Sequence, residues 1–134
     1  MIEEYLMNQA KEIAPELEWT VNYVTADEAT GTVYDEGGSN GNVNNDADTM
    51  YPNYMFWIRS PKDSNQWDRA KVVAYQLYNH FHKKSVDELV HVPELDKDYR
   101  VIFMQAMSQP IFIGVTDDVM VYSLNIQVTL KEEI

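Results

Sequence analysis

Apolar and polar residues repeat with two different periods along the chain, and each period predicts its own kind of element. Residues 2–13 carry apolar side chains every three to four positions, which is typical of one face of a helix, and Pro15 favours an end to that helix. A longer stripe of the same period covers residues 67–81, with Asp63 or Ser64 as its expected N-cap. The sequence therefore predicts two main helices.

Alternation of apolar and polar residues with a period of two predicts strands in much of the remaining chain. It occurs at residues 19–23, 54–59 and 99–106 and, most regularly, at 120–130, while residues 111–115 form a short apolar run. Both faces of the 54–59 strand are largely apolar, so we expect it at the centre of the sheet or at an interface.

Two shorter segments give weaker patterns. Thr32 to Tyr34 is a candidate return strand, and the capping-box pattern from Ser85 to Glu88 predicts one further short helical turn. Together these elements predict an α+β fold, with a mostly antiparallel sheet of four to five strands and the two main helices packed on one face.

Residues 35–49 interrupt the pattern. The segment reads DEGGSNGNVNNDADT and contains three of the five glycines but only one apolar side chain larger than alanine, Val43. Such a segment buries too little apolar surface to offset its ordering entropy, so we predict a long mobile loop. Polar residues of this loop and the aromatic residues after it are our candidates for an interface: Asp35, Glu36, Asn40, Asp46, Asp48, Tyr51, Tyr54 and Trp57.

The chain has 134 residues and a formal net charge of −12, which suits a single acidic domain. The charge is uneven, because residues 1–60 hold 11 acidic and only 2 basic residues. A chain of this charge lacks the cations that bind phosphate or an anionic membrane, so we expect neither a nucleic-acid binder nor a membrane protein. The sequence has no cysteine, which excludes disulfides and thiolate chemistry and favours an intracellular protein.

Motifs for catalysis or metal binding do not stand out. His80 and His82 lie two positions apart on a predicted helix and cannot share a metal ion, so we interpret the histidines as exposed polar side chains. The alternating Asn and Asp residues at 42–48 lack the glycine and glutamate of a calcium-binding EF-hand loop. Phosphate-binding glycine motifs and the GxSxG elbow of hydrolases are missing as well. We therefore predict no enzyme, no cofactor and no metal site.

The order of these elements resembles that of small neck proteins of long-tailed bacteriophages, of the tail terminator or minor capsid (head–tail joining) type. The resemblance rests on a short N-terminal helix, a strand like Trp19–Val24, a variable loop, a strand ending in Arg59-Ser60 and an aliphatic helix. It rests above all on the closing pattern, in which Pro110 and aliphatic residues lead to an aspartate turn at 116–118 and a final strand containing YSLN at 122–125.

The resemblance implies a structural virion protein that forms a ring, typically a hexamer, at the end of the tail tube. Its partners would be copies of itself, the tail tube and the head–tail connector proteins, and DNA would pass through the ring without specific binding. The protein would be found in the tail or neck of the virion, and in the host cytoplasm during assembly. The alternative is an acidic inhibitor domain, such as an immunity protein or a nucleic-acid mimic, which would neutralise a basic partner.

Overall fold

The computed structural model describes residues 2–24, 29–40, 49–61, 69–116 and 118–133. The elements follow one another as α1 (Glu3–Ile13), β1 (Glu18–Val21), β2 (Thr30–Asn40), β3 (Thr49–Pro61), α2 (Arg69–Phe81), β4 (Lys84–Val92), β5 (Lys97–Ala106), β6 (Ile111–Thr116) and β7 (Val119–Glu133). The fold is α+β with two helices and a mostly antiparallel sheet among the described residues, as the sequence predicts.

The sheet has seven strands in the described part of the chain, which corrects the expected four to five. Six of them follow the order β1-β2-β3-β7-β5-β4, and β6 pairs with β7 alone. The sequence-based count is too low because β2 and β4 lack a regular alternation, so neither was recognised as a full strand. Only the β1–β2 pair is parallel; the other described pairs are antiparallel.

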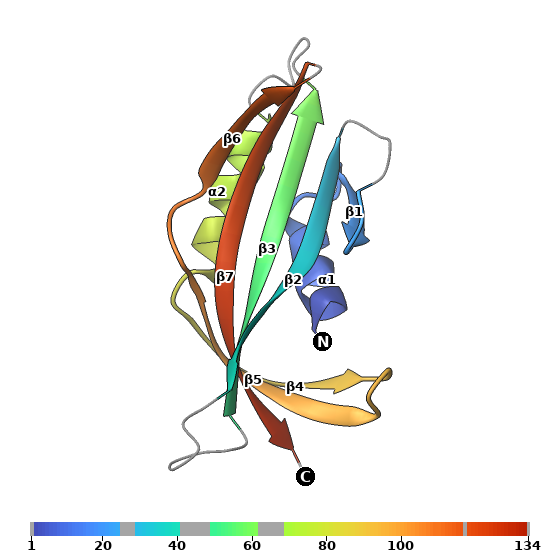
Figure 1. Ribbon diagram of the computed structural model, residues 1–134, viewed down its shortest axis with the longest axis vertical. Helices are drawn as coiled ribbons and strands as arrows, with labels where there is room; N and C mark the ends of the chain where they lie inside the picture. Colours follow the sequence, from blue (N-terminus) through green and yellow to red (C-terminus); the bar gives the residue numbers. More distant parts are fainter. Residues whose placement is uncertain (1, 25–28, 41–48, 62–68, 117, 134) are drawn as a thin grey trace.

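β7 is the longest strand, and three other strands pair with it. β3 lies along one edge, from Pro61 opposite Val119 to Thr49 opposite Lys131. The other edge is shared, because β6 pairs with the first part of β7 and β5 with the second part. β5 and β6 therefore act as one broken strand along β7. Figure 1 shows β3 and β7 running most of the length of the molecule.

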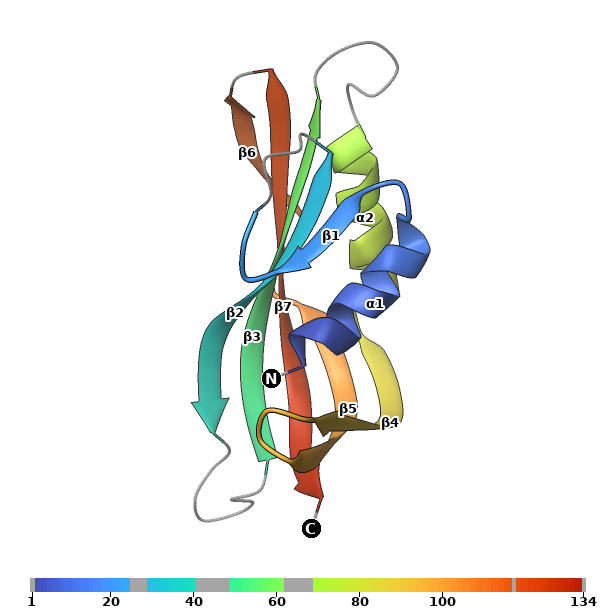
Figure 2. The ribbon, with the colours of Figure 1, turned by 90° about the vertical axis from the view of Figure 1, so that its right-hand side faces the viewer.

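Both helices lie on the same side of the sheet, as Figure 2 shows, and β4 and β5 bend beneath α1. The apolar stripe of α2 packs against the inward side chains of β3 and β7, and the smaller stripe of α1 covers β1 and β2. The predicted alternation is confirmed in β7, where every second residue from Leu124 to Leu130 is buried. The central position expected for the 54–59 strand is also confirmed, since β3 lies between β2 and β7.

The predicted loop at 35–49 is wrong for the residues that the structure describes. Residues 35–40 continue β2 and pair with β3 as far as Asn40 opposite Met50, and Thr49 already belongs to β3. Backbone hydrogen bonds form this extension, so it needs no apolar side chains. A bulge between Asp35 and Gly38 interrupts the register, and Gly37 there has a positive φ of 78°. Residues 41–48 lie outside the described part.

The helical turn expected at Ser85–Glu88 is also wrong, because these residues belong to β4. Lys83 adopts a positive φ of 52°, a conformation that ends the helix and redirects the chain. β4 then pairs with β5, with a bulge between Ser85 and Glu88. The backbone partners supplied by β5 outweigh the local capping pattern.

The start of α2 has a cap that the sequence does not reveal. Asp63 and Ser64, the expected N-cap candidates, and Trp67 lie outside the described residues. The buried side chain of Ser60, at the end of β3, accepts a hydrogen bond of 2.9 Å from the backbone N–H of Ala70. This contact ties the first turn of α2 to the central strand.

Candidate assembly surface and polar cleft

β6 carries the most concentrated exposed apolar surface in the described part of the chain. Ile111, Phe112, Ile113 and Val115 are 43%, 53%, 48% and 42% exposed, and we call these four residues the β6 apolar edge. No strand among the described residues covers the outer side of β6. An unpaired strand edge with apolar side chains is a template for association with another chain.

The backbone of β6 explains why neighbouring side chains are all exposed. The register with β7 shifts between Phe112 and Gly114, and Gly114 has a φ of 146°, which favours glycine. The bulge breaks the alternation, so apolar residues emerge on both sides of the strand. The ring of Phe112 packs against the ring of Tyr122 in β7, with ring centroids 5.3 Å apart, and this contact covers only part of the Phe112 ring.

The acidic interface candidates lie at the other border of the sheet, on the extension of β2. Asp35 and Glu36 are exposed there, and the Asp35 carboxylate accepts a 2.8 Å hydrogen bond from the Gly37 backbone N–H at the bulge. Asn40 is described only by its backbone, which pairs with Met50. Asp46 and Asp48 lie outside the described residues.

The aromatic candidates do not form one patch. Tyr54 is fully buried and faces the helices, which corrects its assignment to an exposed surface. Its hydroxyl accepts a hydrogen bond of 3.4 Å from the Ile2 backbone N–H, and burial raises the pKa of its phenol far above the ordinary value. Tyr51 and Trp57 are half-buried on the opposite face, because side chains alternate along β3.

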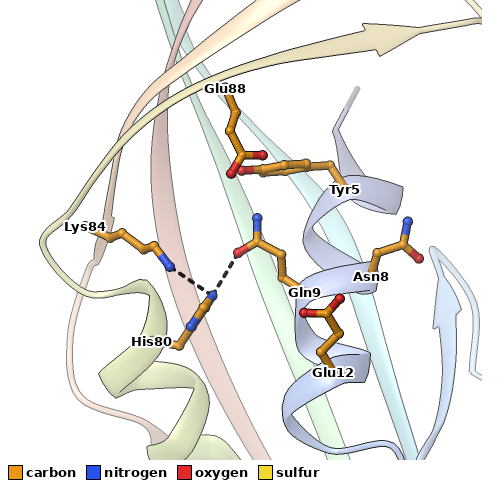
Figure 3. Close-up of a pocket in the computed structure, with 7 residues that line it drawn as sticks. All are labelled: Tyr5, Asn8, Gln9, Glu12, His80, Lys84 and Glu88. Carbon is orange, nitrogen blue, oxygen red and sulfur yellow. Dashed lines mark hydrogen bonds between the residues drawn. The ribbon is translucent and has the colours of Figure 1, made fainter.

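A second candidate site is a polar cleft of about 380 Å³ between α1, the end of α2 and the start of β4. The helix α1 contributes a stripe at spacings of three and four residues, and the opposite wall comes from the α2–β4 junction. Figure 3 shows the lining residues, which are Tyr5, Asn8, Gln9, Glu12, His80, Lys84 and Glu88.

His80 is the centre of the hydrogen bonding in this cleft. Its Nε2 lies 2.8 Å from Gln9 Oε1 and 3.3 Å from Lys84 Nζ. Burial and then the charge of Lys84 lower the pKa of His80, so the imidazole is neutral near pH 7. The shorter contact fits the tautomer with its proton on Nε2, which donates to Gln9 Oε1, whereas the other tautomer would accept from Lys84 instead.

Tyr5 lies at the other end of the cleft, beside Glu88 (Figure 3). Its hydroxyl oxygen is enclosed between the Gln9 amide and the Glu88 carboxylate, and contacts with both side chains affect its pKa. Burial and then the negative charge of Glu88 raise the pKa of Tyr5 to about 12. Tyr5 is therefore a neutral phenol at physiological pH.

Sequence reasoning missed this cleft. It assigned Tyr5 and Gln9 to the apolar face of the first helix and interpreted the histidines as exposed. That interpretation is wrong for His80 and also for His82, which is half-buried and accepts a 3.1 Å hydrogen bond from the Ala106 backbone N–H. The available signal was the polar Gln9 within an otherwise apolar stripe.

Among the described residues, no group of three or more histidine, aspartate or glutamate side chains is placed to hold a metal ion. No helix in this part of the chain has the length and apolar character needed to cross a membrane.

Comparison with known proteins found no matching family model and no matching curated protein.

Proposed function

We propose that this chain is a structural protein of a long-tailed bacteriophage, which forms a ring that ends the tail tube and joins it to the head. The observation that carries this proposal is the β6 apolar edge, four exposed apolar residues on a strand whose outer edge pairs with no other described strand, in a chain with a net charge of −12. In a chain so rich in acids, an uncharged strand edge is suited to burial in an assembly.

The borders of the sheet are suited to a ring. One border ends at β6 and β4, and the other ends at β1 and the acidic extension of β2. A contact that joins one border of a subunit to a different surface of the next is heterologous, and repeated heterologous contacts form a ring when the rotation from one subunit to the next closes. The acidic residues would repel the phosphates of DNA, so DNA could pass through the ring without being held. On this proposal the protein performs no catalysis.

The test is complementation of a phage that lacks this gene, followed by electron microscopy of the particles. We expect the wild-type protein to restore joined heads and tails, and the Ile113→Lys variant to leave them separate. Normal joining without any copy of the protein would rule out the neck function.

The high negative charge also favours the acidic inhibitor as a second candidate. The masses of the native particles distinguish the two. A ring that forms as concentration rises supports the neck protein, whereas a tight one-to-one complex with a basic protein supports the inhibitor.

A further inference from the structure

β1 forms the border of the sheet opposite β6. Among the described strands it pairs with β2 alone, and Figure 1 shows β1 and β6 on opposite sides of the sheet. The backbone N–H groups of Glu18 and Asn22 donate hydrogen bonds of 3.0 and 2.9 Å to carbonyls on the β2 side. Backbone groups alternate in direction along a strand, so the N–H groups of Trp19 and Val21 point away from β2. The outer edge of β1 therefore presents two backbone donors.

The pairing registers place β1 and β6 in the same rows of the sheet. One row of paired residues crosses the sheet through Thr20, Thr32, Trp57, Ser123 and Ile111. β1 is parallel to β2, and the later pairings along this row are antiparallel, so β1 and β6 run in opposite directions. A second copy that continued these rows would bring its β1 against β6 as an antiparallel pair.

An exposed aromatic residue lies directly after β1. Tyr23 is 61% exposed, more than any other large apolar residue in the described part of the chain. Its position is fixed, because the hydroxyls of Thr20 and Thr32 donate to its backbone carbonyl and Asn22 turns the chain with a positive φ of 63°. A fixed tyrosine loses little entropy when a partner covers it. The row of these threonines ends at Ile111, so the Tyr23 turn and Ile111 lie on the same face of the sheet.

β4 is the other open strand on the border of β6, and it fits β1 less well. It carries charges at Lys84, Asp87 and Glu88, and a bulge between Ser85 and Glu88 interrupts its ladder; both features protect an edge from pairing. Its rows also lead elsewhere, since Glu88 connects through β5, β7 and β3 to Asn40 in the extension of β2. β6 reads IFIGVT and has no charge, so it brings no further acid against a neighbouring copy with a net charge of −12.

We propose that the outer edge of β6 in one copy pairs antiparallel with the outer edge of β1 in a second copy, so that the sheet continues from subunit to subunit and Ile111 packs near Tyr23 of the neighbour. Addition of a strand to an open edge supplies backbone hydrogen bonds, and the apolar side chains beside it lose their exposure to water. The contact joins two different surfaces, which is the kind of contact that a ring needs. The inference rests on the proposed ring function and names its subunit contact.

Cysteine cross-linking tests the contact, because the chain contains no cysteine of its own. Tyr23→Cys and Ile111→Cys are made in separate preparations of the whole chain, one of them isotope-labelled, and are mixed and oxidised while native mass is followed. Leu95→Cys replaces Ile111→Cys in the matched control, since Leu95 is 48% exposed against 43% for Ile111 but lies in the turn after β4. We expect cross-linking between the two preparations to be about tenfold faster than in the control, because a disulfide needs Cα atoms within about 7 Å.

Val21→Pro tests the backbone pairing itself. Proline removes the N–H that points away from β2, and edge strands tolerate proline at such positions. We expect the variant to keep its circular dichroism spectrum but to need about tenfold more protein for self-association, because a backbone hydrogen bond between copies is lost. Val21→Ile keeps the N–H and should associate like the wild type. If Val21→Pro does not fold, the cross-linking experiment decides.

The other outcomes separate the contact from the ring. A ring-sized particle whose cross-linking is no faster than in the Leu95 control, or a folded Val21→Pro that associates like the wild type, would overturn the β6–β1 contact and leave the ring standing. Rapid cross-linking of Ile111→Cys with itself, in a particle of dimer mass, would show that two β6 edges meet and would overturn both. Absence of self-association at every concentration would also remove both.

Discussion

The indole ring of Trp19 lies directly on Gly31 across the parallel pair of β1 and β2. A Cβ atom added to Gly31 would lie 2.6 Å from Cη2 of that ring, closer than real Cβ atoms approach. The ring is fixed there, because its Nε1–H donates a 2.8 Å hydrogen bond to the Ala14 carbonyl and it packs nearly perpendicular to the ring of Phe56. Gly31 is therefore needed for close approach of the ring.

Replacement of Gly31 by alanine should lower the free energy of unfolding by about 1–3 kcal/mol, because the ring must shift and loses contacts with the core. Urea denaturation measures the change. Trp19→Leu removes the ring, so Gly31→Ala should lower the free energy of unfolding much less in that background. An equal cost in both backgrounds would show that the ring is not the cause.

The Ser60 cap of α2 gives a second stability prediction. Ser60→Ala removes the acceptor for the Ala70 N–H in a fully buried place, and we expect a loss of about 1–2 kcal/mol in thermal or urea unfolding. Ser108→Ala is the control, since Ser108 is exposed and bonds only its neighbour Gln109, and it should change stability by less than about 0.5 kcal/mol. Similar losses in the two variants would contradict a special role for Ser60.

The lowered pKa of His80 predicts an acid-sensitive contact between the helices. As pH falls below the ordinary histidine value of 6.5, the unfolded chain takes up a proton more readily than the folded one, so the free energy of unfolding decreases. His80→Gln keeps a polar partner for Gln9 but cannot titrate, and should lose less stability between about pH 8 and about pH 5.5.

Lys84→Gln should reduce the same acid sensitivity, because the Lys84 charge contributes to the lowered pKa of His80. Urea midpoints at several pH values test both variants. Identical pH profiles of the wild type and His80→Gln would show that His80 does not govern this dependence.

The assembly surface can be tested without a phage. Ile113→Lys places a charge in the centre of the β6 apolar edge, and we expect it to keep the wild-type melting temperature within a few degrees but to block self-association in analytical ultracentrifugation. Leu95→Lys is the matched control, because Leu95 is equally exposed but lies in the turn after β4. Loss of assembly in both variants would point to a general effect of charge, and normal assembly of Ile113→Lys would exclude β6.

The sequence predicts those elements whose side chains alone determine their period. The stripe of α2 and the alternation in β3 and β7 are of this kind. In β5 the alternation from Tyr99 is correct as far as Val101, but a bulge before Phe103 shifts the register, so Met104 is buried and Phe103 is only half-buried. A bulge depends on the partner strand, which the local sequence does not contain.

The candidate sites were harder to predict for a related reason. The extension of β2 exists because β3 offers backbone partners, and the polar cleft exists because the end of α2 meets α1 from far along the chain. Residues 38–40 of this extension pair with β3, so a deletion there would remove part of a paired strand. The apolar residues of β6 were visible in the sequence, but their exposure depends on β6 being an unpaired edge.

The position of β7 in the chain has a consequence for synthesis on the ribosome. All three strands that pair with β7 precede it, so β3 and β5 emerge before the strand that will lie between them. β3 carries the apolar residues Phe56 and Ile58, and its edge toward β7 has no partner until β7 has been translated. Unpaired apolar strands are prone to aggregate. The centre of the sheet can therefore form only after β7 has been translated, and chaperones that shield nascent apolar segments would act during that interval.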